Sequence, residues 1–160
     1  MIIHAAGLDP EGVEVDFPLD RSGQPADQDD SFFVRSAVLS GRVLPERGGL
    51  AFRGRLRGQI EIECSRCLTP YGFPVEREFD LFYAFAPVRG KEVQIPDNAL
   101  DYAFLHEGDG IDLEQVAMEQ IYLEVPMKPL CRTACRGLCA LCGSNLNERE
   151  CLCAGASPVS

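Results

Sequence analysis

The 160-residue chain has two histidines, no long apolar run and no excess of basic residues. A membrane-spanning helix needs about 20 consecutive apolar residues, and no stretch of the sequence approaches that length. Residues 1–10 lack both a basic region and a long apolar run, so they do not have the pattern of a signal peptide. We therefore expect no membrane span and a cytoplasmic protein whose thiols are kept reduced.

The sequence also lacks the patterns typical of catalysis. A catalytic zinc site keeps one open position and usually includes histidine, yet His4 and His106 both lie far from the cysteine pairs in sequence. No phosphate-binding loop of the G-x-x-x-x-G-K type and no nucleophile elbow occurs. We therefore predict that the protein is not an enzyme.

The charge is strongly acidic, with 25 Asp and Glu against 15 Lys and Arg, for a net charge of −10. Proteins that hold nucleic acid through a broad electrostatic surface usually carry a basic face. The acidic balance favours a basic protein as partner, although acidity can also serve solubility alone. Direct RNA contact is expected to be weak.

Alternating apolar and polar residues predict antiparallel strands with one wet face. The pattern is longest in Phe52–Cys64 and is mirrored in 73–85, where we expect Phe73, Val75, Phe79, Leu81, Tyr83 and Phe85 to point inward and Arg77 to be an exception. Two further strands are predicted over 12–19 and 32–44, with a hairpin turn at 45–49.

The charged residues of the two long strands predict how these strands pair. Setting Leu56 opposite Phe79 places Arg57 opposite Glu78 and Arg55 opposite Asp80, and we expect this register. The arginine row of Arg53, Arg55 and Arg57, with Arg66 nearby, is then either neutralised across the hairpin or free to contact phosphates.

One helix is predicted in the second half of the chain. Asp112 has the character of an N-cap with Gln115 as its capping-box partner, and Pro126 ends the helix near Glu124. Its expected apolar stripe consists of Leu113, Val116, Ala117 and Ile121. Segments 20–31 and 87–98 are predicted to be loops.

These elements predict an α+β fold that is mainly antiparallel β, as a meander or partly closed barrel, with one helix and a C-terminal cysteine-rich zinc knuckle. We expect an antiparallel β domain over 1–130, with the helix near 112–124. A cysteine-rich zinc-binding segment, 131–153, would pack on it, and 154–160 would be a disordered tail.

Eight cysteines in a reducing compartment indicate bound metal more than disulfides. They occur as C-x2-C, C-x3-C, C-x2-C and C-x-C pairs: Cys64 and Cys67, Cys131 and Cys135, Cys139 and Cys142, Cys151 and Cys153. A C-x2-C turn points both sulfurs at one ion, and helical spacing would place the thiols of Cys131 and Cys135 on one face. Two structural zinc ions use all eight thiolates.

The sequence leaves the grouping of the cysteines open. We favour Cys64, Cys67, Cys131 and Cys135 as one site, and Cys139, Cys142, Cys151 and Cys153 as a local second site. An interleaved arrangement, in which Cys64 and Cys67 join Cys139 and Cys142, is the alternative. A redox switch and a disulfide scaffold are further interpretations of the same thiols.

A specific motif points to a known family. The segments Cys64-Ser-Arg-Cys-Leu68, Ile111-Asp-Leu113 and Pro126 to Pro129 precede Cys135-Arg-Gly-Leu-Cys-Ala-Leu-Cys-Gly-Ser-Asn-Leu-Asn147 and Cys151-Leu-Cys153. Over about residues 30–153 the chain resembles the YceD family of large-ribosomal-RNA-subunit accumulation proteins. The resemblance implies a non-enzymatic role in accumulation or processing of large-subunit rRNA, with the large-subunit precursor as partner.

Two other functions compete with this expectation. A zinc-thiolate redox sensor would release its metal on oxidation. A general protein-interaction module for a basic ribosomal protein would differ from the first expectation only in its target.

Overall fold

The computed structural model describes residues 1–21, 32–86, 101–106 and 108–153. Of the loops and tail expected from the sequence, residues 22–31, 87–98 and 154–160 lie outside the described residues. The elements are β1 (Ile2–His4), β2 (Val13–Leu19), β3 (Phe32–Glu46), β4 (Gly49–Glu63), β5 (Pro70–Phe85), β6 (Asp101–Leu105), β7 (Gly110–Asp112) and α1 (Leu113–Glu124).

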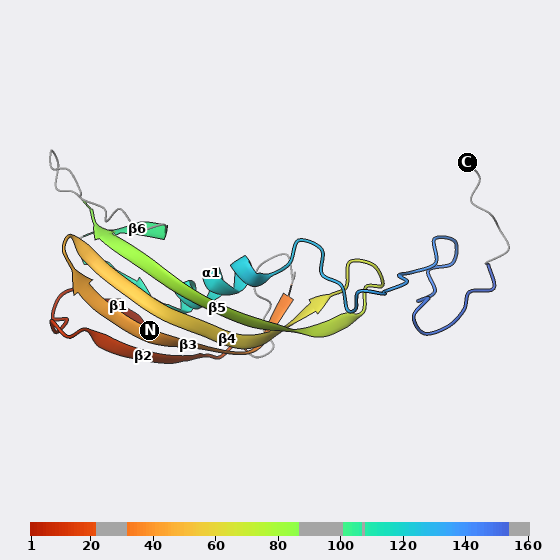
Figure 1. The fold of residues 1–160 in the computed structure, drawn as a ribbon, viewed down its shortest axis with the longest axis horizontal. Helices are drawn as coiled ribbons and strands as arrows, with labels where there is room; N and C mark the ends of the chain where they lie inside the picture. Colours follow the sequence, from red (N-terminus) through yellow and green to blue (C-terminus); the bar gives the residue numbers. More distant parts are fainter. Residues whose placement is uncertain (22–31, 87–100, 107, 154–160) are drawn as a thin grey trace.

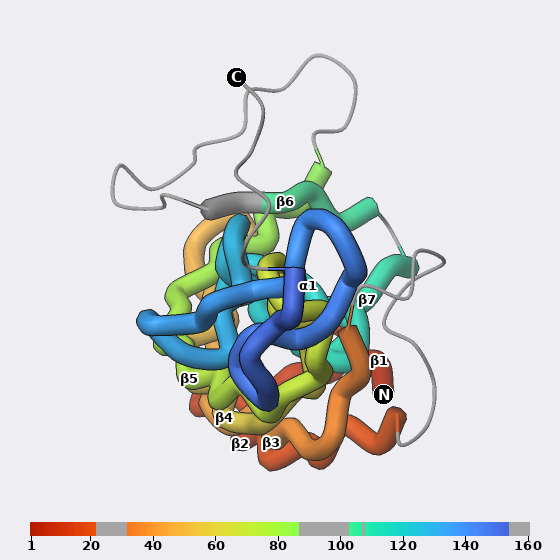
Figure 2. The backbone as a smooth tube through the Cα atoms, turned by 90° about the vertical axis from the view of Figure 1, so that its right-hand side faces the viewer, coloured from red at the N-terminus to blue at the C-terminus, as the bar shows by residue number. Residues whose placement is uncertain are grey.

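The strands form an antiparallel meander with a parallel edge strand. Their order is β2-β3-β4-β5-β6, in which only β5 and β6 run parallel, while β1 and β7 pair as a separate two-stranded sheet. The large sheet curls around α1 without closing (Figures 1 and 2). The predicted α+β class with one helix and a C-terminal cysteine cluster is therefore confirmed, in its open form.

The core lies between the concave face of the sheet and α1. Its fully buried members include Phe32, Leu39, Phe52, Leu56, Ile60, Leu113 and Ile121. All four residues of the predicted helical stripe are buried in it. Burying each large aliphatic or aromatic side chain contributes about 1.5–3 kcal/mol, so this layer positions the helix on the sheet.

The predicted register of the long hairpin is wrong by two residues. Leu56 lies opposite Arg77, not Phe79, and Arg53, Arg55 and Arg57 lie opposite Asp80, Glu78 and Glu76. Three cation–carboxylate pairs form in this register, whereas the predicted one would have placed Arg53 opposite Phe82. The ring of Phe79 also covers Gly54, where an added Cβ would come within 2.7 Å of it.

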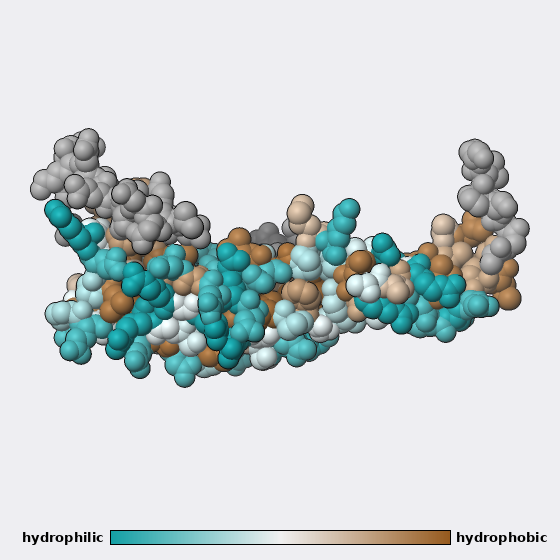
Figure 3. Space-filling model, viewed as in Figure 1, coloured by the Kyte–Doolittle hydropathy of each residue, from teal (hydrophilic) through white to brown (hydrophobic). Residues whose placement is uncertain are grey.

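The outer face of the sheet carries a row of ion pairs. Arg53 Nε lies 3.1 Å from Asp80, Arg57 Nε lies 2.9 Å from Glu76, and Arg55 donates to Glu78. The visible surface over the strands is correspondingly hydrophilic (Figure 3). The arginine row is therefore neutralised across the hairpin, as the first of the two interpretations expected.

The end of β5 departs from the predicted inward pattern. Phe85 is 43% exposed, while Phe82 and Ala84 are buried on the opposite face with Ala51. The ring of Phe82 lies over Gly49, which has no side chain to exclude it. Here the sheet is covered on both faces, so strict alternation stops predicting burial.

Helix α1 begins and ends where the sequence predicts. Asp112 caps it by accepting a hydrogen bond from the Glu114 amide at 3.0 Å. The predicted capping-box role of Gln115 is wrong, because its amide instead donates to Glu119 one turn later, at 2.9 Å. Within the described residues, no helix has the length and apolar character needed to cross a membrane.

Arg77, the charged exception on the apolar face, joins β5 to α1. It donates to Gln120 at 3.0 Å and to Glu124 at 3.1 Å. Gln120 is only 3% exposed and is the one buried polar residue in the described part of the chain. The register thus pairs the buried amide with a charged donor.

Candidate metal centres

The first group of cysteines joins the end of the long hairpin to the segment after the helix. Cys64 and Cys67 lie in the turn between β4 and β5, and Cys131 and Cys135 follow α1. The four sulfurs lie within 4.8 Å of one another, with Cys64 to Cys135 and Cys67 to Cys131 both at 3.7 Å. Cys64, Cys67 and Cys135 are buried, each 5% exposed or less.

The second group lies at the far end of the molecule from β1 and β6 (Figure 1). It consists of Cys139, Cys142, Cys151 and Cys153, again with all sulfurs within 4.8 Å. Cys151 lies 3.3 Å from both Cys139 and Cys142. Cys142 is exposed and the other three cysteines are partly buried, so this group is more solvent-exposed than the first.

The two C-x2-C turns share one backbone conformation. The Leu68 amide donates to the Cys64 carbonyl at 2.9 Å, and the Gly143 amide donates to the Cys139 carbonyl at 2.8 Å. The residue after each pair has a positive φ, 57° at Leu68 and 69° at Gly143. Glycine adopts this conformation freely, but Leu68 is the only non-glycine residue with positive φ in the described chain.

Hydrogen bonds from neighbouring residues hold the first group of cysteines in place. Asn147 donates its side-chain amide to the Cys135 sulfur at 3.3 Å and accepts from the Arg136 amide at 2.8 Å. Arg66 donates to the Cys135 carbonyl at 3.0 Å, and the Ser65 amide donates to the Pro129 carbonyl at 2.8 Å. These partners fix the orientation of the ligands, as outer contacts do at metal sites.

Sulfur pKa values differ within each group. Burial opposes ionisation of Cys64, but backbone hydrogen bonds from Cys131, Cys67 and Arg66 lower its pKa to about 6. Burial and the neighbouring sulfurs raise the pKa of Cys131 to about 12. Hydrogen bonds from Ser144 lower the pKa of Cys142 to about 6. Hydrogen bonds with Thr69 also lower the pKa of Cys67, so each group contains at least one thiol that ionises readily.

The sulfur distances fit a shared metal ion better than disulfides. A disulfide needs sulfurs about 2.05 Å apart, and all eight cysteines are free. Four thiolates around a tetrahedral ion, with metal–sulfur bonds of about 2.3 Å, lie about 3.8 Å apart. The 3.7 Å distances of the first group match this value, and both groups can hold a metal ion.

The structure brings the eight predicted residues together in the two favoured sets of four, not in the interleaved sets. The expected helical placement of Cys131 and Cys135 does not occur: the Cys135 amide donates to the Arg132 carbonyl at 3.1 Å in a turn. Sequence reasoning missed Asn147. The Asn145-x-Asn147 pattern after the last C-x2-C turn was its signal, because amide side chains serve as donors to thiolates and turns.

Comparisons with known proteins agree with these observations. The model of the family described as "Large ribosomal RNA subunit accumulation protein YceD" matches residues 52–159. An uncharacterized protein of Mycobacterium leprae is 38% identical over 85 residues, covering 52% of this chain and 37% of the relative.

Two plant proteins extend the comparison. The chloroplastic YCED homolog 1 of Arabidopsis thaliana is 26% identical over 133 residues, covering 69% of this chain and 41% of its own length. The homologue of the same name from Zea mays is 28% identical, covering 72% and 48%. The chain therefore spans less than half the length of these relatives. No solved structure matches it.

Proposed function

This chain belongs to the YceD family, and on that premise we propose that it is a non-enzymatic, zinc-binding ribosome-biogenesis factor of the cytoplasm. Its role would be to support the accumulation or processing of large-subunit ribosomal RNA. The family match is the observation that carries this proposal, since it covers both cysteine groups and the hairpin that holds the first.

Zinc is the metal that best suits these ligands. Four thiolates in a closed tetrahedral set are typical of structural zinc, whereas a catalytic zinc keeps an open position. We propose all eight cysteines as ligands of two ions: Cys64, Cys67, Cys131, Cys135, Cys139, Cys142, Cys151 and Cys153. Zinc binding contributes about 10–16 kcal/mol per site in small domains, so we expect 131–153 to be a separate zinc-dependent segment on the β domain.

The partner we propose is the large-subunit precursor, bound chiefly through basic ribosomal or assembly proteins. The net charge of −10 disfavours a phosphate backbone. Arg53, Arg55 and Arg57 are each paired with a carboxylate on the outer face. Direct contact with RNA would therefore be weak and local.

A complementation experiment tests the role. Depletion of the protein should lower large-subunit rRNA relative to small-subunit rRNA, and the protein should co-sediment with large-subunit precursors in a sucrose gradient. Cys135→Ser should fail to restore the ratio, while Thr133→Ser, an exposed position in the same segment, should restore it. An unchanged rRNA ratio on depletion, with no co-sedimentation, would refute the ribosomal role.

The exposure of the second group favours one other function, a zinc-thiolate redox sensor. Cys142 is exposed and its pKa is lowered to about 6 by hydrogen bonds from Ser144, and exposed thiolates are the ones that oxidise. Zinc release from the second group at low peroxide concentration, while the first group stays loaded, would support the sensor. Release only at concentrations that also unfold the protein would exclude it.

A further inference from the structure

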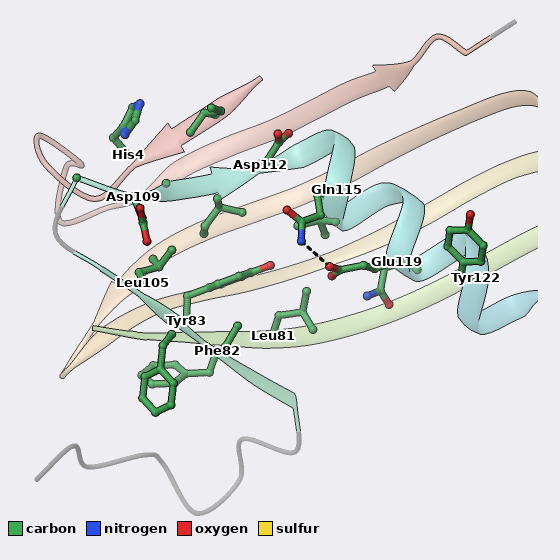
Figure 4. A pocket seen from close by; sticks show the side chains of 18 of the residues that line it. His4, Leu81, Phe82, Tyr83, Leu105, Asp109, Asp112, Gln115, Glu119 and Tyr122 are labelled. Carbon is green, nitrogen blue, oxygen red and sulfur yellow. Dashed lines mark hydrogen bonds between the residues drawn. The ribbon is translucent and has the colours of Figure 1, made fainter. Parts of the chain in front are cut away.

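A groove lies between α1 and the end of the large sheet (Figure 4), and no cysteine of either group lines it. Residues from β1, β5, β6, β7 and α1 line it, and its volume is about 980 Å³. That size is at the upper end of the roughly 300–1,000 Å³ found for binding sites of small ligands. The groove is large enough to take several side chains of a partner.

Much of the wall and rim of the groove is apolar. Leu81, Tyr83 and Leu105 form part of its wall (Figure 4). Ile2 and Leu123 line it as well, although they are 53% and 59% exposed. Large apolar side chains that are exposed together around a concave surface are typical of interaction sites.

The charged side chains in the groove are acidic. Asp109, Asp112 and Glu119 line it, and the described lining residues include no lysine or arginine. Asp112 is engaged by the helix N-terminus and lies 3.9 Å from the terminal amine of Met1. Glu119 accepts a hydrogen bond from the neutral amide of Gln115, and no cation among the described residues pairs with it. Within the described part of the chain its negative charge is therefore uncompensated.

Tyr83 supplies an aromatic face beside this charge. Its ring lies across the groove (Figure 4). Burial, together with the charge of Glu119, raises the pKa of its hydroxyl, which therefore stays protonated. Among the described residues, its hydroxyl has no hydrogen-bond partner. A neutral phenol ring next to a carboxylate suits a lysine or arginine side chain, whose stem packs on the ring while its cation meets the carboxylate.

We propose that this groove binds a basic segment of a partner protein, in which a lysine or arginine is paired with Glu119 and an adjacent apolar residue packs against Leu123. The proposal rests on the proposed function, because it names the surface through which a basic ribosomal or assembly protein binds. A phosphate-rich ligand does not suit the groove, since Asp109 and Glu119 repel it.

Peptide binding to the purified, zinc-loaded protein tests the groove without requiring ribosomes. The probes are three fluorescein-labelled 12-residue peptides: one alternating leucine and arginine, one with glutamate in place of arginine, and one with glycine in place of leucine. Fluorescence anisotropy at about 150 mM salt measures the affinities, because exposed charge pairs are screened at that ionic strength.

The variants separate the groove from net charge. Glu119→Gln keeps the side-chain shape and the bond from Gln115, and we expect it to weaken the leucine–arginine peptide about tenfold, as the loss of one charge-assisted hydrogen bond does. Leu123→Ser, at an exposed position, should weaken it as well. Glu14→Gln on β2 removes the same charge at an 84% exposed side chain that does not line the groove and should have no effect.

The outcomes decide between occupants. Equal affinities for the arginine and glutamate peptides, or equal losses in Glu119→Gln and Glu14→Gln, would overturn the proposal. Tighter binding of a single-stranded RNA 12-mer, weakened by Leu123→Ser, would assign the groove to RNA. A dimer in light scattering that Glu119→Gln abolishes would assign it to a second copy of the chain. A ribosomal role that fails while the peptide result holds would refute only the proposed function.

Discussion

Arg77 is predicted to contribute more to stability than any other arginine of the hairpin. Arg77→Met removes the donor to Gln120, which is 3% exposed and cannot turn to water instead. An unsatisfied buried acceptor costs about 1–3 kcal/mol. The half-exposed pair with Glu124 adds about 0–1 kcal/mol. The total loss in the free energy of unfolding is therefore about 1–4 kcal/mol.

The matched control is Arg55→Met on the same hairpin. Its pair with Glu78 lies on the solvent-exposed outer face, with side chains 39% and 72% exposed, so its loss should change the free energy of unfolding only slightly. For a chain of this size each kcal/mol shifts Tm by about 2–4 °C. Thermal unfolding followed by circular dichroism, with zinc present, should show a drop in Tm of about 2–16 °C for Arg77→Met and a smaller drop for Arg55→Met.

A double variant tests the cause of the loss. Arg77→Met with Gln120→Met removes the donor and the buried acceptor together, so it should recover about 1 kcal/mol relative to Arg77→Met alone. Equal losses for Arg77→Met and Arg55→Met would refute the reasoning. A double variant less stable than the single one would show that Gln120 stabilises the fold through packing instead.

Three further predictions concern the cysteine groups. Native mass spectrometry should find two zinc ions per chain. Cys64→Ser and Cys131→Ser should lose the zinc ion of the first group, and Cys142→Ser should lose that of the second group. Loss of the same ion in all three variants would contradict two separate sites. Metal binding needs thiolates, and the lowered pKa values of Cys64 and Cys142 favour the thiolate form of the folded protein above about pH 6. Zinc release, measured with a chromogenic chelator, should therefore rise as the pH falls through 6. Zinc release that does not depend on pH would contradict this prediction. Leu68→Gly should raise Tm or leave it unchanged, because it relieves a left-handed conformation that costs leucine about 1–2 kcal/mol. Gly143→Leu should lower zinc retention by the second group, because it introduces the same strain there. A lower Tm for Leu68→Gly together with unchanged zinc retention for Gly143→Leu would show that backbone φ does not limit these turns.

Local patterns in the sequence were enough to place most elements. Alternation predicted β4 and most of β5, because burial of one sheet face imposes a period of two on the chain itself. The helix was predicted from its N-cap Asp112 and its apolar stripe, because burial of one helix face imposes a period of 3.6 residues on the sequence. The C-x2-C spacings predicted thiol turns, since both sulfurs of a pair arise within one turn.

Pairing between distant segments was decided only by the tertiary structure. Two registers of the long hairpin each offered cation–carboxylate pairs, and the actual one also depended on Phe79 covering Gly54. The short strands β1, β6 and β7 have too few residues for a period to be recognised, and β6 pairs in parallel across a long connection.

What the sequence alone determined is therefore the set of chemical groups: eight thiols in close pairs, an acidic surface and an amphipathic sheet and helix. Which four sulfurs meet depends on folding, because Cys67 and Cys131 lie 64 residues apart in the chain and 3.7 Å apart in space. The groove around Glu119 arises in the same way, because its lining comes from α1, from β1 near residue 1 and from β5, β6 and β7. Composition and hydrophobic periodicity describe single segments of the chain, whereas such sites form only where separate segments pack together.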